Sequence, residues 1–233
     1  MQVIIVYSRC FMIKDMFECA VVDPLEMDVL WAMGFRHFGT TFFRYEVQIH
    51  HGRPVHVMPL RIDLGRFQPS RSQKRIIRRN KDLDVFFRKA AIDEEKERLF
   101  TAHKSRFKEN VPDTIYNFFS ELPGQVPCPA QECCLFQENI LVAAGFFDLG
   151  QSAVSSVYTF FDPAPALGRR SLGIYVLLQQ LQYAADMGKT YLYPGYAYRE
   201  PSFYDYKKNF AGLEYYDWTG AWMPLDKTGQ TKQ

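Results

Sequence analysis

The fold is decided by the stretch SSVYTFFDPAPALGRRSLGIYVLLQQLQYAADMGKTYLYPGYAY, residues 155–198. It begins with SSVYTFF, whose β-branched and aromatic residues favour a strand, and a loop containing proline and glycine follows. The next segment, IYVLLQQLQYAADM, has apolar residues at spacings of three and four and is followed by Gly188, so it predicts a helix with a glycine stop. TYLYPGYAY then predicts a second strand.

The loop before this predicted helix has the composition of an anion site. Gly168, Arg169 and Arg170 come shortly before the helix, where free backbone N–H groups and the helix dipole attract phosphate. The same order of elements forms the core of the GNAT acyltransferases, in which this loop holds the pyrophosphate of an acyl carrier. Ser171 stands where the first loop glycine of that pattern is expected. An ordinary α/β unit with a polar loop fits the same spacing.

The overall composition indicates a globular protein that needs no disulfides. The chain has 233 residues, of which 47% are hydrophobic and 23% charged, and its net charge is only +2. Any nucleic-acid contact must therefore be local. The chain has no signal peptide pattern, no apolar run long enough to span a membrane and an odd number of cysteines, five. We expect a cytoplasmic protein with free thiols and no membrane partner.

Two halves are expected, either tightly packed together or forming a single domain. Residues 1–125 form the first, with a helix from Asp23, a β-hairpin over residues 40–64 and a basic helix that starts near Ser70 and runs to about residue 90. A second amphipathic helix covers DEEKERLFTAHKSRFKEN. The segment LPGQVPCPAQ, with its three prolines, is the expected linker. Residues 126–233 form the second half, which contains the decisive stretch.

The segment PSRSQKRIIRRN has an unusual density of positive charge for a nearly neutral chain. Its cations lie at spacings of three and four, so most share one helix face, while Ile76 and Ile77 point towards the core. Such a face can neutralise nucleic-acid phosphates, or it can be an ordinary solvated helix. The helical run contains no acidic residue before Asp82, which lowers the weight of the second interpretation.

Several blocks together resemble the arginyl-tRNA–protein transferases, most of all the bacterial branch that moves leucine onto N-terminal Asp or Glu. The specific blocks are PLRI with FQPSRSQKR, within residues 59–83, and SSVY followed by DP and SLG, within residues 155–181. MGFRHFGTTFFRY is a weaker match, and the resemblance extends over most of residues 25–215.

The resemblance implies an α/β, GNAT-like acyltransferase fold with a mixed, mostly antiparallel sheet and flanking helices. It also implies an aminoacyltransferase, without a cofactor, that moves leucine or arginine from aminoacyl-tRNA to the N-terminal amine of a protein that starts with an acidic residue. The expected catalytic residues are Ser155, Ser156 and Tyr158. The expected substrate-binding residues are Arg61, Arg71, Asp162, Tyr206 and Lys207. The expected tRNA-binding residues are Lys74, Arg75, Arg78, Arg79, Arg169 and Arg170.

The sequence also departs from the family pattern. The family's cysteine cluster before the PLRI block is replaced by EVQIHHGRPVHVM, and YPGYAY replaces the usual L-G-Y. We expect no metal at His50, His51 and His56, because adjacent histidines point apart and no Cys or acid completes the set. Two alternatives stay open: a GNAT enzyme that uses acetyl-CoA on an amine, and a tRNA-binding relative without catalysis.

Overall fold

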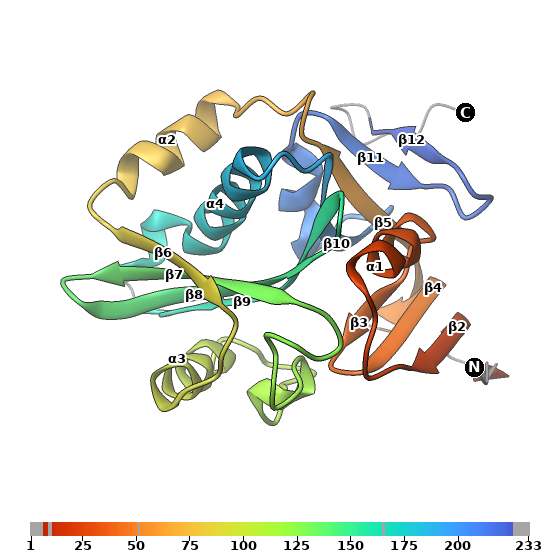
Figure 1. Ribbon diagram of the computed structural model, residues 1–233, viewed down its shortest axis with the longest axis horizontal. Helices are drawn as coiled ribbons and strands as arrows, with labels where there is room; N and C mark the ends of the chain where they lie inside the picture. The colour runs from red at the N-terminus through yellow and green to blue at the C-terminus, as the bar shows by residue number, and fades with distance from the viewer. Residues whose placement is uncertain (1–6, 9–10, 51, 165, 226–233) are drawn as a thin grey trace.

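The structure is a computed structural model, and it describes residues 7–8, 11–50, 52–164 and 166–225. Within these residues a twelve-stranded sheet forms the centre of the molecule, with helices on both of its faces (Figure 1). The strands are β1 (Tyr7–Ser8), β2 (Phe11–Glu18), β3 (Arg36–Phe38), β4 (Thr41–His50), β5 (Arg53–Asp63), β6 (Asp84–Lys89), β7 (Ala130–Gln137), β8 (Ile140–Leu149), β9 (Ala153–Phe161), β10 (Tyr191–Tyr198), β11 (Leu213–Tyr216) and β12 (Trp222–Pro224).

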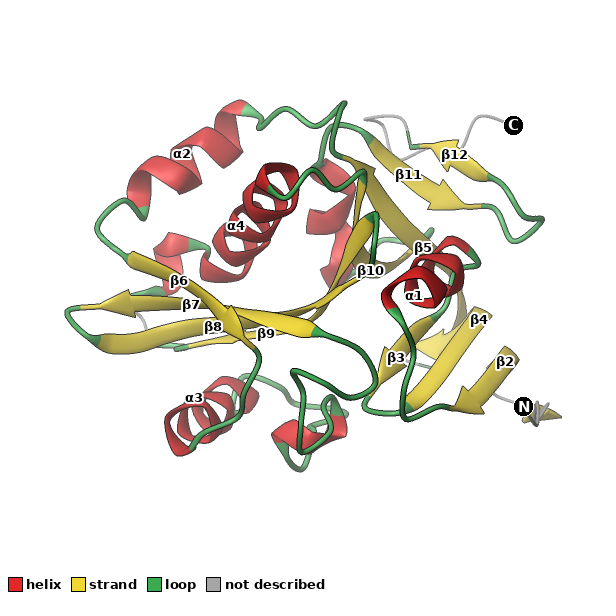
Figure 2. Ribbon diagram, viewed as in Figure 1, coloured by secondary structure: helices red, strands yellow, loops and turns green. Residues whose placement is uncertain are grey.

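The helices are α1 (Pro24–Ala32), α2 (Arg71–Arg79), α3 (Glu94–Lys104) and α4 (Leu172–Asp186), with the short 3-10 turns η1 (Ile115–Asn117), η2 (Gly168–Arg170) and η3 (Phe203–Asn209) (Figure 2). α4 packs on one face of the sheet, with α2 outside it, and α3 covers the other face. The expected helix from Asp23, the helix after residue 92 and the helix before Gly188 are confirmed.

The strand order is β1-β2-β4-β5-β10-β9-β8-β7-β6, with β3, β11 and β12 attached beside this path. β9 and β10 run parallel, because α4 connects them as a crossover. Every other pairing among the described strands is antiparallel. The expected mixed, mostly antiparallel sheet with flanking helices is confirmed, as is the β4–β5 hairpin.

α4 lies unusually close to the sheet because β8 has a glycine beneath it. A Cβ on Gly145 would lie 2.3 Å from Cγ1 of Val176, so any other residue there would push the helix away. Val176, Leu178 and Leu181 are buried in the main hydrophobic core. This close contact fixes α4 relative to β8.

The basic helix α2 is shorter than expected. The side chain of Ser70 caps its first turn together with Gln73, and Asn80 ends the helix. The expectation of a helix to about residue 90 is wrong, because residues 84–89 pair with β7 as the edge strand β6. The sequence DVFFRK is compatible with a half-buried strand as well as with a helix. It forms a strand because its backbone pairs with the edge of β7.

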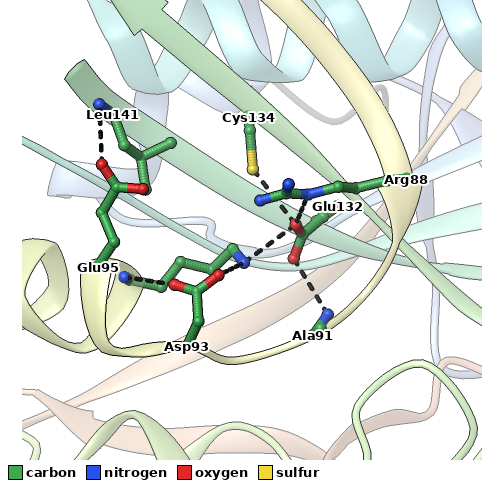
Figure 3. A network of polar contacts seen from close by, with 8 residues as sticks. Arg88, Ala91, Asp93, Glu95, Glu132, Cys134 and Leu141 are labelled. Atoms are coloured by element: carbon green, nitrogen blue, oxygen red, sulfur yellow. Dashed lines mark hydrogen bonds and ion pairs between the residues drawn. The ribbon is translucent and has the colours of Figure 1, made fainter. Parts of the chain in front are cut away.

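A buried ionic network fixes α3 to the sheet (Figure 3). Lys96 of α3 is 1% exposed, and its ammonium lies 2.6 Å from a carboxylate oxygen of Asp93 and 3.1 Å from one of Glu132. Glu132, on β7, also accepts hydrogen bonds from Arg88 and from the backbone of Ala91. Each buried charge in this network thus has an opposite charge beside it.

The sheet crosses the boundary expected near residue 125, since β5 pairs with β10 and β6 with β7. The division into two halves stays a prediction. The described cysteines are free thiols, and Cys128, Cys133 and Cys134 are buried as expected, whereas Cys10 lies outside the described residues. Among the described residues, no helix combines the length and apolarity needed to cross a membrane.

Candidate functional site

β9 and β10 separate shortly after they meet, which leaves a fork in the centre of the sheet. Their parallel pairing covers only three positions and ends at Ser155 and Tyr193, although both strands continue. Pro194 follows Tyr193 and has no N–H to donate to a ladder, and Gly195 adopts a positive φ of 95°. At this point β10 also shifts its register against β5. The sequence YPG therefore opens the sheet.

The guanidinium of Arg36 occupies this fork. Its Nη1 donates to Oγ of Ser155 at 2.7 Å and to the backbone oxygen of Tyr193 at 3.5 Å, and its Nη2 donates to the backbone oxygen of Ser156. Arg36 is buried, and burial lowers its pKa from the ordinary value, with the charge of Asp148 acting in the opposite sense. These hydrogen bonds hold the guanidinium in one orientation. They take the place of the backbone hydrogen bonds that β9 and β10 no longer make to each other beyond Ser155 and Tyr193.

A second cation, Lys207 of η3, lies next to Arg36. An ideal Cβ on Gly195 would lie 3.0 Å from Nζ of Lys207 and 3.6 Å from Cζ of Arg36, so glycine is required between them. Nζ of Lys207 donates to the backbone oxygen of Tyr196 at 3.1 Å. Lys207 keeps some of its surface in contact with solvent, yet desolvation, together with repulsion from Arg36, lowers its pKa to about 7.

The two cations have no carboxylate partner within the described chain. Among the described residues, no Asp or Glu forms an ion pair with Arg36 or Lys207. Asp148, whose charge affects Arg36, bonds to His37 instead, at 2.8 Å. Two close like charges in a desolvated site are unfavourable unless an anion compensates them. A bound anion would relieve this repulsion, which makes the fork a candidate anion site.

Phenol groups lie near the two cations: Nζ of Lys207 is 5.2 Å from the centre of the Tyr204 ring, and Tyr45 and Tyr196 are close enough to Arg36 to affect its pKa. Burial raises the pKa of Tyr158, of Tyr198 and of Tyr206 to about 12 each, and it also raises that of Tyr45 and Tyr204. These side chains stay neutral at physiological pH and can donate hydrogen bonds. They offer a bound molecule polar groups without adding negative charge.

The structure brings most of the expected catalytic and acceptor residues to the fork. Ser155 and Ser156 bond to Arg36, and Tyr158 continues along β9, with its ring stacked on Phe118 at 3.8 Å. Lys207 lies beside Arg36, and Tyr204 and Tyr206 lie close enough to Tyr158 to contribute, after burial, to its raised pKa. Ser155 is 1% exposed, so its hydroxyl serves Arg36 and is not open to solvent.

Three other expected residues lie elsewhere. Asp162 follows the end of β9 and accepts a hydrogen bond from the backbone of Ala164. Arg61 pairs with Glu214 at 2.7 Å and stacks on the rings of Tyr191 and Trp222, at 4.0 and 4.5 Å. Its guanidinium is thus already bound within the chain. Arg71, the third, is exposed at the first position of α2.

The expected tRNA-binding residues gather on one surface. Lys74, Arg75, Arg78 and Arg79 are exposed on α2, and a surface hollow of about 290 Å³ is lined by Lys74, Ile77 and Arg78. Arg79 donates to the backbone oxygen of Arg169, which joins α2 to the loop before α4. Ile76 and Ile77 pack against the core, as expected.

One expected member of that surface is neutralised. Arg170 forms two hydrogen bonds with Asp82, at 2.8 and 2.7 Å. The carboxylate of Asp82 therefore balances the positive charge of Arg170. Lys74, Arg75 and Arg78 form no ion pair among the described residues, so α2 supplies the free charge.

The sequence analysis did not identify Arg36 as a site residue. The residue lies in the weaker block MGFRHFGTTFFRY, 119 positions before Ser155. That block was the available signal, because it matched the same family as SSVY. No local pattern in the sequence places the two in contact.

Comparison with known proteins gives consistent results. A family model described as "Arginine-tRNA-protein transferase, C terminus" matches residues 94–217. The aspartate/glutamate leucyltransferase of Chromohalobacter salexigens is 33% identical over 205 residues, which cover 84% of this chain and 81% of the relative. The enzyme of the same name from Marinobacter nauticus is 32% identical over 199 residues, with the same coverage. Among solved structures, L-PGS from Bacillus licheniformis matches with a TM-score of 0.45 and 17% identity, over 69% of this chain and 61% of that one.

Proposed function

The chain belongs to the arginine-tRNA–protein transferase family, and we propose from this premise that it transfers leucine from leucyl-tRNA to proteins that begin with Asp or Glu. Leucine as donor and acidic acceptors are favoured by the names of the relatives, which are aspartate/glutamate leucyltransferases. Within the structure, the observation that carries the proposal is the pair of cations at the fork, Arg36 and Lys207, which have no carboxylate partner among the described residues.

The acceptor's acidic side chain supplies the missing anion. A guanidinium and an ammonium side by side can hold one carboxylate between them, and such charge-assisted hydrogen bonds are about twice as strong as neutral ones. An Asn or Gln at the same place would leave the two positive charges uncompensated. Arg36 and Lys207 therefore select acidic over amide acceptors.

The reaction places the acceptor's α-amine beside the aminoacyl ester. The amine nitrogen attacks the ester carbonyl, an oxyanion forms, and the ribose oxygen of the terminal adenosine leaves with the proton that the amine loses. The bond formed is an amide and the bond broken is the ester. Tyr158, which stays neutral because burial raises its pKa to about 12, donates to the oxyanion. Holding the two reactants in line contributes most of the rate.

The tRNA lies across α2 and the start of α4. Lys74, Arg75 and Arg78 bind phosphates through free positive charge. The side chain of Ser171 makes no cap hydrogen bond at the start of α4, so backbone N–H groups there are open to a further phosphate. Arg79 donates a hydrogen bond to the backbone oxygen of Arg169, which fixes α2 relative to the loop before α4.

The test is a transfer assay with purified protein, charged tRNA and peptides. We expect transfer of leucine to peptides that begin with Asp or Glu, and at least tenfold less to matched peptides that begin with Asn or Gln. Transfer from arginyl-tRNA but not from leucyl-tRNA would overturn leucine as the donor amino acid. Equal transfer to Asp and Asn peptides would overturn the preference for acidic acceptors. Acetylation of the same peptides by acetyl-CoA, without any transfer from charged tRNA, would overturn the whole proposal.

A further inference from the structure

Behind the fork, three side chains of different chemistry meet in the interior. They are His37 of β3, Cys128 of the linker before β7 and Asp148 of β8. The atoms that each could offer to a metal all lie within 4.8 Å of one another. All three residues are buried, with exposed fractions of 5%, 1% and 3%.

The hydrogen bonds of His37 fix which ring nitrogen faces the other two residues. Its Nδ1 lies 2.9 Å from the backbone oxygen of Gly39, which can only accept, so Nδ1 carries a proton. In the neutral ring, Nε2 is therefore unprotonated, and it points at a carboxylate oxygen of Asp148, 2.8 Å away. Two acceptors at this distance need a proton between them, and the same two atoms can hold a metal ion instead once they separate to roughly 3.3 Å. A backbone carbonyl on the far nitrogen is also the usual support of a metal-binding histidine.

A small cavity adjoins the cluster. Its volume is about 10 Å³, and its lining includes His37, Asp148 and Ser120 among phenylalanine and proline side chains. A space of this size holds roughly one water molecule. It offers the position for a fourth ligand, while the surrounding apolar groups exclude bulk solvent.

We propose that His37, Cys128 and Asp148 bind one zinc ion, with a water molecule as the fourth ligand. Imidazole, thiolate and carboxylate are the three ligand types that zinc takes in proteins, and a tetrahedral site needs four ligands. On binding, the Cys128 thiol releases its proton to solvent, and the zinc, thiolate and carboxylate charges cancel. A role for Cys128 as a nucleophile is disfavoured, because the residue is only 1% exposed.

The proposed site differs from the histidines at the β4–β5 turn, where the sequence analysis expected no metal. It joins three segments: β3, the proline-rich linker and β8. His37 follows Arg36 directly in β3, and Asp148 pairs across the sheet with Ser155. The ion would therefore join β3, which carries Arg36, to β8, which pairs with the strand of Ser155, and it would neutralise Asp148, the carboxylate whose charge acts on that arginine.

The experiment measures metal directly and does not depend on transfer activity. Protein purified without chelators is analysed by elemental mass spectrometry, and we expect about one zinc per chain, since three protein ligands hold it. The zinc is then removed and replaced by Co²⁺, whose bond to a thiolate gives an absorption band in the near ultraviolet. Wild-type protein that contains no zinc and gives no such band would overturn the proposal.

Two alanine variants separate the proposed ligand from other buried thiols. Cys128→Ala removes the ligand, and we expect the Co²⁺ band to be lost. Cys133→Ala removes an equally buried cysteine outside the cluster, and we expect the band to stay. A band that survives Cys128→Ala but disappears in Cys133→Ala would place the metal elsewhere and contradict the assignment. The wild-type measurement decides the question even where a variant folds poorly.

Discussion

Among the described residues, Lys96 and Lys207 lie in opposite situations, the first 1% exposed and the second only partly buried. Lys96, beneath the sheet, has two carboxylates within 3.1 Å and belongs to a closed ionic network (Figure 3). Lys207, at the fork, has an arginine as its nearest charged neighbour and no carboxylate partner among the described residues. The first arrangement is complete within the chain and serves stability. The second calls for an anion from outside, and we interpret it as a binding site.

This difference shows how a buried charge can be assigned to structure or to function. Desolvation of a lysine is unfavourable in both places, but only Lys96 is compensated by carboxylates of the described chain. An uncompensated cluster persists where a ligand provides the compensation, and perturbed groups gather at such sites. The following predictions test this contrast.

The largest effect is expected for Arg36→Met. The substitution removes the guanidinium that bonds to both β9 and β10 and that we propose binds the acceptor's carboxylate. We therefore expect transfer to acidic peptides to fall roughly 10²–10³-fold. The measurement is kcat/KM with charged tRNA, together with a thermal melt. Arg98→Met removes an exposed arginine of α3 and should leave both unchanged. Full activity of Arg36→Met would remove the fork from the proposed mechanism.

Lys96→Met tests the other side of the comparison. It leaves Glu132 buried with only Arg88 as a cationic partner among the described residues, so we expect the free energy of unfolding to fall by about 3 kcal/mol. Denaturant unfolding measures this loss. kcat/KM per folded molecule should stay close to that of the wild type. A large fall in kcat/KM without loss of stability would contradict the structural role of this network.

The pH dependence of acceptor binding follows from Lys207. Its pKa of about 7 means that the lysine is charged below pH 7 and neutral above it, whereas the peptide carboxylate stays ionised throughout. KM for an acidic peptide should therefore rise roughly tenfold from pH 6 to pH 8. Lys207→Arg keeps its charge over this range, so this rise should be absent and only the titration of the peptide's α-amine, which both proteins share, should remain. Identical profiles for both proteins would show that Lys207 does not contact the carboxylate.

The smallest effect is expected for the exposed cations of α2. Lys74→Ala combined with Arg78→Ala should weaken tRNA binding several-fold and reduce the slope of log affinity against log salt by roughly 1–2, without changing kcat. Arg98→Ala with Lys108→Ala changes the net charge equally on another surface and serves as the control. An unchanged salt slope in the α2 variant would indicate that the helix is merely solvated.

Sequence reasoning predicted α2 as a basic helix but extended it too far. The cap at Ser70 and the spacing of the cations are local features, so the sequence reveals them. The end at Asn80 depends on the pairing of β6 with β7, between residues almost 50 positions apart, and no local pattern contains this information. The same holds for Arg61, which the sequence predicts to bind substrate. In the structure it pairs with Glu214, a residue far away in the sequence.

By itself, the sequence determined the types of the main elements, the family and one basic surface, which we propose for tRNA, because periodicity, caps and charge spacing act over a few residues. Only the tertiary structure decided that Arg36 meets Ser155 and Lys207, and that none of the described carboxylates pairs with Arg36 or Lys207. The physical reason lies in the fork. Pro194 and Gly195 separate the strands β9 and β10, which α4 has brought together, and the space that opens is occupied by a residue from a distant strand.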